Sequence, residues 1–199
     1  IQLQDFPEPP VPYRPQRGEP AISSDRRVRL IVGFSGAGMT AWAAEAARHA
    51  TDALVYFDVS DLPSRSVPTN LAREIVARFL GGREKGVGGM QLPPSGGMDA
   101  LRYADSLLAE QGIRAIVVLD NVHRLSVADL RQIVDGASNQ AFIGLGQPWA
   151  ERALAEATLG IDSERLGGFG ADAVAAVFAA EGVGVDPETV ESILHLTGG

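Results

Sequence analysis

The stretch Gly33-Phe34-Ser35-Gly36-Ala37-Gly38-Met39-Thr40 carries the strongest signal in the chain. It matches the phosphate-binding pattern G-x-x-x-x-G-K-[ST], except that Met39 stands in place of the lysine. In that pattern, backbone N–H groups of the loop surround the phosphates, the threonine hydroxyl holds Mg²⁺, and the lysine neutralises the β- and γ-phosphates. We therefore predict phosphate contacts over Gly33–Ala41 and a Mg²⁺ ligand at Thr40, without the usual lysine cation.

The flanking sequence supplies the context that such a loop requires. Residues 28–32 form a short β-rich run that only Arg29 interrupts, and residues 41–48 are strong helix formers apart from Trp42. A strand followed by a glycine loop and a helix places the loop amides at a helix N-terminus, where anions bind.

A second motif lies near the middle of the chain. Residues 115–119 are apolar and Asp120 follows them, which is the Walker B arrangement of a strand that ends in a carboxylate for the Mg²⁺ shell. In a parallel sheet, both motifs would lie at the carboxyl edge of the strands, where ligands bind. We therefore expect the amides of Gly36–Thr40 to face the carboxylate of Asp120.

The hydrophobic pattern alternates strands with helices and predicts an α/β fold, a three-layer parallel-sheet core of the P-loop type followed by the start of a C-terminal helical lid. The expected strands are 28–32, 53–59, 113–119 and 141–145, with a short edge strand within 161–166. The first expected helix follows Thr40 and covers residues 41–48. Further helices are expected over residues 70–80, 98–111, 127–136, 149–157, 171–181 and 187–196. We assign residues 28–168 to the core and residues 169–199 to a truncated lid.

Two segments are expected to be irregular. Residues 1–27 are rich in proline, and they are interpreted either as a linker from an upstream domain or as an arm that folds back along the core. Residues 81–97 are glycine-rich and are expected to form a connecting loop. That loop contains Lys85, the only lysine in the chain, for which a solvated position is a better interpretation than a substitute for the missing cation.

Composition limits the classes of protein to consider. The chain has 199 residues, of which 45% are hydrophobic, enough for one ordinary domain with a core. Its net charge of −8 disfavours nucleic acid as a partner, because domains that bind nucleic acid are usually basic. It has no cysteine, and its three histidines show no metal-ligand spacing. Without a signal peptide or a spanning apolar run, a cytoplasmic protein with no membrane contact is expected, and Ile1 suggests a piece of a longer chain.

With these motifs, the chain resembles the nucleotide-binding domain of STAND and related AAA-type P-loop ATPases. The resemblance covers most of residues 28–199 and includes segments 119–123, 142–148 and 190–199, the last of which resembles a lid helix ending in a T-G-G-x-P turn, here without the proline. It implies sheet order 5-1-4-3-2, ATP or ADP with Mg²⁺ as cofactors, and flanking domains in the same chain. Members of the family act as nucleotide switches, closed with ADP, and opened and homo-oligomerised with ATP.

The resemblance gives roles to single residues. The loop glycines and Thr40 match the phosphate and Mg²⁺ positions, and Asp120 matches the Mg²⁺ carboxylate. Asn121 stands where many AAA relatives have the catalytic glutamate, and an amide can orient a water molecule but cannot accept its proton at neutral pH. Gln147 stands where a polar sensor contacts the γ-phosphate and where many STAND members have arginine. Asp120, Asn121 and Gln147 are thus the candidate catalytic residues.

These departures separate nucleotide binding from turnover. Loss of one electrostatic donor lowers a rate by ~10²–10³-fold, whereas binding also depends on the loop amides and the helix N-terminus, which remain. The leading hypothesis is an ATP- or ADP-binding switch domain of a larger signalling ATPase, ATPase-like in fold, with weak or absent hydrolysis. The alternatives are a pseudo-NTPase scaffold or oligomerisation domain that binds no nucleotide and, less favoured, a DNA-linked AAA ATPase.

The remaining candidates are interpreted as structural. The two tryptophans are expected to pack in the core rather than to stack on a base. Asp58 and Asp61 follow the second strand, and turn or cap roles are expected for them. Arg152 and Arg165 are expected at the surface, with a role as arginine fingers in trans as the alternative.

Overall fold

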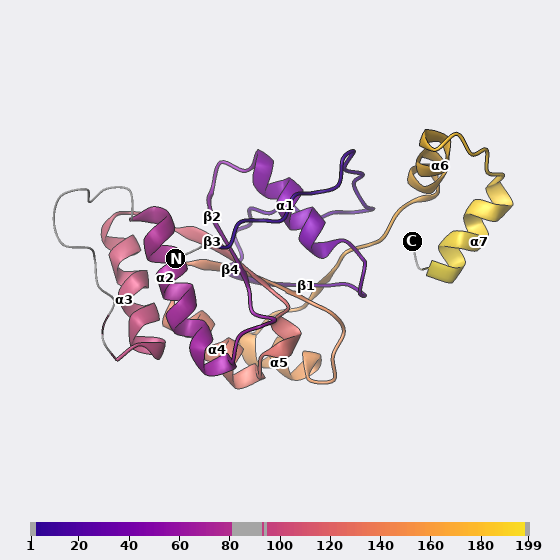
Figure 1. Ribbon diagram of the computed structural model, residues 1–199. Coiled ribbons are helices and arrows are strands. Elements are labelled where there is room, and N and C mark those ends of the chain that lie inside the picture. Colours follow the sequence, from indigo (N-terminus) through magenta and orange to yellow (C-terminus); the bar gives the residue numbers. More distant parts are fainter. Residues whose placement is uncertain (1–2, 81–92, 94, 198–199) are drawn as a thin grey trace.

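The chain forms a parallel five-stranded sheet with helices on both faces (Figure 1). The computed structural model describes residues 3–80, 93 and 95–197. The strands are β1 (Val28–Val32), β2 (Ala53–Asp58), β3 (Ala115–Asp120), β4 (Ala141–Gly146) and β5 (Glu164–Arg165). Their order is β2-β3-β4-β1-β5, which is the implied 5-1-4-3-2 order counted from the other edge. Both the α/β class and the strand order are therefore confirmed.

Helices connect the strands and cover the sheet. They are α1 (Met39–His49), α2 (Val67–Phe79), α3 (Gly97–Glu110), α4 (Val127–Gly136), α5 (Arg152–Leu159), α6 (Ala171–Ala180) and α7 (Pro187–Thr197), with short 3₁₀ turns η1 (Ser64–Ser66) and η2 (Val122–Arg124). In Figure 1, α1 lies on one side of the sheet and α2 to α5 lie on the other. The carboxyl ends of all five strands therefore meet at one edge, where the loop before α1 lies.

Two helix starts differ by three residues from the sequence prediction. α2 begins at Val67 rather than at residue 70, because Pro68 lies in its first turn, where the missing proline N–H costs nothing. α5 begins at Arg152 rather than at residue 149, because Trp149 belongs to the preceding turn and packs against the core, while its carbonyl accepts the Arg152 N–H at 3.2 Å.

Alternating side chains of the strands form two apolar clusters, one on each face of the sheet. On β1, Leu30 and Val32 pack with α2, α3 and α4, whereas Ile31 packs with α1 on the opposite face. The central strands β3 and β4 are buried along their whole length, as expected for parallel strands covered on both sides. The two central strands that lead to the carboxyl edge therefore lie inside the core.

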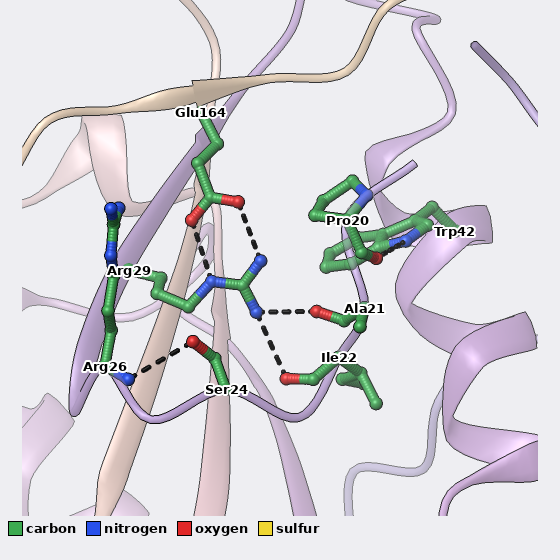
Figure 2. A network of polar contacts seen from close by, with 8 residues as sticks. All are labelled: Pro20, Ala21, Ile22, Ser24, Arg26, Arg29, Trp42 and Glu164. Carbon is green, nitrogen blue, oxygen red and sulfur yellow. Dashed lines mark hydrogen bonds and ion pairs between the residues drawn. The ribbon is translucent and has the colours of Figure 1, made fainter. Parts of the chain in front are cut away.

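Arg29 is a charged residue within the apolar pattern of β1, and all three nitrogens of its guanidinium group donate hydrogen bonds inside the protein (Figure 2). Its side chain is only 5% exposed, and Nε and Nη2 donate to the two carboxylate oxygens of Glu164 at 2.8 and 2.7 Å. Nη1 donates to the carbonyls of Ala21 and Ile22 at 2.7 and 3.2 Å. One guanidinium thus joins β1, β5 and the N-terminal segment. The bond from Arg29 lowers the pKa of Glu164.

The N-terminal segment follows the surface of the core over much of its length. Figure 1 shows its indigo trace running beside α1. Ile22 belongs to the same buried cluster as Trp42, whose indole N–H donates to the Pro20 carbonyl at 3.0 Å (Figure 2). Nearer the start of the segment, the Gln4 side chain accepts a hydrogen bond from the Asp58 N–H at the end of β2. Trp42 is therefore a packing residue, as the sequence analysis expected.

Helices α6 and α7 follow β5 and extend beyond the sheet in Figure 1. A contact from the N-terminal segment reaches them, because Arg14 Nη2 donates to the Ala176 carbonyl of α6 at 3.3 Å. The assignment of residues 169–199 to a lid stays a prediction. In the part of the chain that the structure describes, no helix combines the length and the apolar character needed to cross a membrane.

Candidate phosphate-binding site

The glycine loop between β1 and α1 presents backbone amides at a helix start. Gly36 and Gly38 have φ angles of 84° and 77°, which side-chain-bearing residues rarely adopt, so both positions depend on glycine. The first turn of α1 closes with the Trp42 N–H on the Gly38 carbonyl at 2.8 Å. The amides of residues 39–41 lie in that first turn and have no acceptor within the helix. The helix start also has no side-chain cap and no acid in its first turn, so it can attract an anion.

Thr40 and Asp120, which are 80 residues apart in the sequence, meet at this loop. The Thr40 hydroxyl donates to Asp120 Oδ2 at 2.6 Å, and Asp120 is only 5% exposed. The Tyr56 hydroxyl donates to the same oxygen at 2.9 Å, and the Asn121 N–H donates to Oδ1 at 2.8 Å. Burial, followed by the charge of Asp120, raises the pKa of Tyr56, so this phenol stays a donor at all ordinary pH values.

The donor set around Thr40 and Asp120 suits Mg²⁺. One hydroxyl and one carboxylate are the hard oxygen ligands that Mg²⁺ prefers, and it usually completes its shell with water and phosphate oxygens. Among the described residues, no group of three or more His, Cys, Asp or Glu side chains could hold a metal ion by itself. Thr40 and Asp120 could therefore supply two oxygen ligands to a Mg²⁺ ion whose other ligands are water and phosphate oxygens.

Met39 fills the base of the loop with an apolar side chain. A Cβ built on Gly33 would lie 3.2 Å from both Cγ and Sδ of Met39, so the thioether passes directly beside the first glycine of the loop. The same side chain packs against the cluster that contains Ile31 and Trp42. Met39, which stands where the pattern has a lysine, thus contributes packing to the loop and no charge.

Asn121 is held by the neighbouring strand. Its backbone has a positive φ of 63°, which asparagine tolerates better than most residues. Its side-chain Nδ2 donates to Asp58 Oδ1 at 2.9 Å, and the Ser60 N–H donates to the same oxygen at 2.8 Å. Asp58 therefore has the turn role that the sequence analysis expected, and it also fixes the orientation of the Asn121 amide.

His123 and Gln147 are joined behind the loop. The backbone N–H of Gln147 donates to His123 Nδ1 at 3.2 Å, so this nitrogen is the acceptor of the ring and the proton of the neutral imidazole lies on Nε2. Burial, followed by the charge of Arg124, lowers the pKa of His123 and keeps the ring neutral at pH 7. Sequence reasoning gave His123 no role, because a single histidine without a spaced partner carries no signal.

An open pocket of about 320 Å³ collects these groups. Its lining includes residues 34–41, Asp120, Asn121, His123 and Gln147. The structure thus brings together all the site residues that the sequence analysis selected except Gly33, which lines the adjoining pocket. Their chemical roles stay predictions. Lys85 lies outside the described residues.

Two further pockets border the same loop. One, of about 410 Å³, lies between the N-terminal segment, the loop and α6, and its lining is largely apolar, with Pro10, Pro12 and Val177 beside Tyr13, Arg14 and Gln16. The other, of about 440 Å³, lies on the β5 side of the loop and includes Arg165. Arg165 is exposed, as expected, and within the described ranges no acid forms an ion pair with it. Each of these two further pockets thus has one arginine among its described lining residues, Arg14 in the first and Arg165 in the second.

The comparisons with known proteins show the fold. No protein-family model and no curated protein matches the chain. One similar solved structure is a Signal Transduction ATPase with Numerous Domains (STAND) protein from Pyrococcus horikoshii, which has a tetratricopeptide repeat sensor. It is 17% identical to this chain, with a TM-score of 0.53, over 86% of this chain and 26% of that chain. The ORC2 protein of Aeropyrum pernix, in ADPNP–ADP complexes, gives 16% identity and a TM-score of 0.52 over 77% and 45% of the two chains. Cdc6p of Pyrobaculum aerophilum has 14% identity and a TM-score of 0.53, over 76% of this chain and 42% of that chain.

These likenesses confirm an α/β fold of the P-loop ATPase type. The chain spans less than half the length of each of these three proteins. At identities below one fifth, the comparison concerns the path of the backbone and leaves the chemistry of the site to be argued from its own residues.

Proposed function

We propose that this chain is a nucleotide-binding switch domain of a larger signalling ATPase, and that it binds ATP or ADP with Mg²⁺ but hydrolyses ATP weakly or not at all. The observation that carries the proposal is the 2.6 Å contact between Thr40 and Asp120 beside the uncapped start of α1. A hydroxyl, a carboxylate and a row of free amides at one sheet edge are the parts that a nucleotide phosphate with its Mg²⁺ requires.

The residues of the site have separate roles in this proposal. The amides of Gly36 and of residues 38–40 hold the phosphates, whereas the Ala37 N–H already donates to the Phe34 carbonyl at 2.9 Å. Thr40 and Asp120 supply the oxygen ligands for Mg²⁺. Tyr56 keeps the carboxylate of Asp120 in place through its hydroxyl. Bound Mg²⁺ would neutralise negative charge on the phosphate oxygens. The apolar pocket between the N-terminal segment and α6 adjoins the loop and suits the base of the nucleotide.

Slow hydrolysis follows from the groups that could assist it. The amide of Asn121 cannot take a proton from water, and its own NH₂ is bound to Asp58. Gln147 contributes no charge, and Met39 places a thioether where a cation would neutralise the phosphates. Since each missing electrostatic donor lowers a rate by ~10²–10³-fold, these departures together favour binding over turnover.

A switching role is supported by the pocket that takes the base. Its walls come from the N-terminal segment, the glycine loop and α6, so a ligand there touches all three at once. Arg14 already connects the first of these to α6. A ligand that binds one arrangement of these elements more tightly would shift the population toward that arrangement. The similar structure from Pyrococcus horikoshii is described as a signal transduction ATPase, which agrees with such a role.

The alternative of a pseudo-NTPase scaffold is favoured by one observation, the apolar Met39 side chain at the base of the loop. Isothermal titration calorimetry with ADP–Mg²⁺ and ATP–Mg²⁺ separates the two functions, because the switch domain releases heat with both nucleotides and the scaffold with neither. A DNA-linked ATPase is less favoured because the net charge is −8. Salt-dependent binding to duplex DNA would revive it.

A further inference from the structure

Gln16, in the N-terminal segment, connects the glycine loop to the segment that leads from β5 to α6. Its Nε2 donates to the Ala37 carbonyl at 2.5 Å, and its Oε1 accepts the Gly168 N–H at 2.9 Å. Both partners are backbone groups with fixed polarity, a carbonyl and an N–H. The orientation of the Gln16 amide is therefore determined by its neighbours, and both ends of the amide are used.

The bond to Ala37 sets the direction of one peptide unit in the loop. In a trans peptide, the carbonyl of one residue and the N–H of the next point in opposite directions. Because the Ala37 carbonyl is held toward Gln16, the Gly38 N–H points away from Gln16. Gly38 also lines the pocket that contains Thr40 and Asp120. Such a peptide can flip in a glycine-rich loop, because glycine adopts positive and negative φ with similar ease.

The backbone around Gln16 is itself fixed from several sides. The Gln16 N–H donates to Glu19 Oε1 at 2.7 Å, and the Arg17 N–H donates to the Gly168 carbonyl at 3.0 Å. A Cβ added to Gly167 would come within 2.6 Å of the Arg17 carbonyl oxygen, so the two backbones are in direct contact. A Cβ added to Gly38 would lie 3.0 Å from Gln16 Nε2, which shows equally close packing at the loop. The side chain of Gln16 therefore spans a fixed gap.

We propose that Gln16 is a positioning residue that holds the Ala37–Gly38 peptide with its N–H available to a phosphate and links the loop to the segment before α6. This inference rests on the proposed function and adds to it a residue outside the phosphate-binding pattern. A phosphate that draws on the Gly38 N–H acts on the same peptide unit that Gln16 holds. The state of the loop is thereby communicated to Gly168, three residues before α6 begins.

The test uses a substitution that keeps the size of the side chain, replaces the NH₂ donor by a second oxygen and adds a negative charge. Gln16→Glu retains an oxygen for the Gly168 N–H but places a second carboxylate oxygen against the Ala37 carbonyl, and this repulsion favours the flipped peptide. We expect the affinity for ADP and for inorganic pyrophosphate to fall roughly tenfold or more, as for the loss of about one good contact. Gln16→Ala, which removes both bonds without adding charge, should lower both affinities ~2–5-fold.

The matched control is Gln4→Glu, since Gln4 is another glutamine of the same segment, and its Oε1 accepts the Asp58 N–H at 2.6 Å. This variant adds the same charge, keeps its acceptor and should leave pyrophosphate affinity within ~twofold of wild type. Melting temperatures without ligand should be similar for Gln16→Glu and Gln4→Glu. In ¹⁵N NMR spectra, pyrophosphate should shift the Gly38 amide of wild type and of Gln4→Glu more than that of Gln16→Glu.

Two results would overturn the inference, and they differ from failure of the function itself. If Gln16→Glu is folded and binds pyrophosphate as wild type does, Gln16 does not position the loop. If Gln16→Glu and Gln4→Glu lose affinity equally, the segment acts only through general packing or charge. If wild type binds neither ADP nor pyrophosphate, the proposed function is wrong, and the role of Gln16 is rejected with it.

Discussion

Replacing Met39 by lysine should restore the charge that the glycine loop lacks. Methionine and lysine both have unbranched side chains, and lysine is longer by one heavy atom. The Met39 thioether already follows a path past Gly33, 3.2 Å from the position of an added Cβ there, and is partly buried. A lysine stem can take the same path, so its ammonium would emerge beside the phosphates that the loop amides hold.

The size of the effect follows from the exposure of the loop. Two unit charges about 4 Å apart near a protein surface attract each other by ~4 kcal/mol at an effective dielectric constant of ~20. Water reaches this loop freely, since the Phe34 side chain is 74% exposed, and both charges lose hydration when they meet. If about a third to a half of the attraction remains, affinity rises by ~1.4–2 kcal/mol, or roughly ten- to thirtyfold.

Calorimetry with ADP–Mg²⁺ and ATP–Mg²⁺ measures this directly in wild type, Met39→Lys and Met39→Gln. The glutamine variant is polar and of similar length but uncharged, so it should stay close to wild type. Hydrolysis by Met39→Lys should remain slow, because Asn121 still provides no proton acceptor. Equal affinities for the lysine and glutamine variants would refute the reasoning, because charge would then not be what the loop lacks.

Three further predictions concern charged side chains of the neighbouring strands β1 and β5, namely Arg29, Glu164 and Arg165. Arg29→Met should lower the free energy of unfolding by roughly 2–4 kcal/mol, because Glu164 and two carbonyls lose their donor, and a loss under ~1 kcal/mol in chemical denaturation would contradict this. Acid should weaken the same contact. The pKa of Glu164 is lowered from 4.5, so its stabilisation is complete above pH 4.5 and is lost as pH falls through the lower folded value. Glu164→Gln should flatten that pH dependence in thermal unfolding. Arg165→Ala should weaken ATP binding up to ~fivefold, and more at low salt, while Arg152→Ala should not.

The parts of the fold that could be predicted are those fixed by local chemistry. Gly36 and Gly38 are needed for positive φ angles within a few residues of each other, and an apolar run that ends in Asp120 describes a buried strand by itself. Parallel pairing then requires the two segments to share an edge, so the contact between Thr40 and Asp120 follows from local patterns plus topology. The sheet order came from resemblance rather than from the pattern.

The parts that could not be predicted depend on partners far away in the sequence. Arg29 looked like a break in a strand because its partner, Glu164, lies 135 residues later. Tyr56 appears in the sequence as an ordinary strand aromatic, and its bond to Asp120 exists only once β2 and β3 pair. Gln16 lies in a proline-rich stretch with no periodicity, and its two partners, Ala37 and Gly168, are 131 positions apart in the sequence. Such contacts carry no signature in a single sequence.

The central claim is that the loop amides bind phosphate while Thr40 and Asp120 bind its Mg²⁺, and titration of ADP with and without Mg²⁺ tests it most directly. Wild type should release heat under both conditions and bind ADP more tightly when Mg²⁺ is present. Thr40→Val should keep the Mg²⁺-free affinity and lose the gain from Mg²⁺, because the amides remain and the hydroxyl ligand is gone. Absence of heat from wild type under both conditions would contradict the claim.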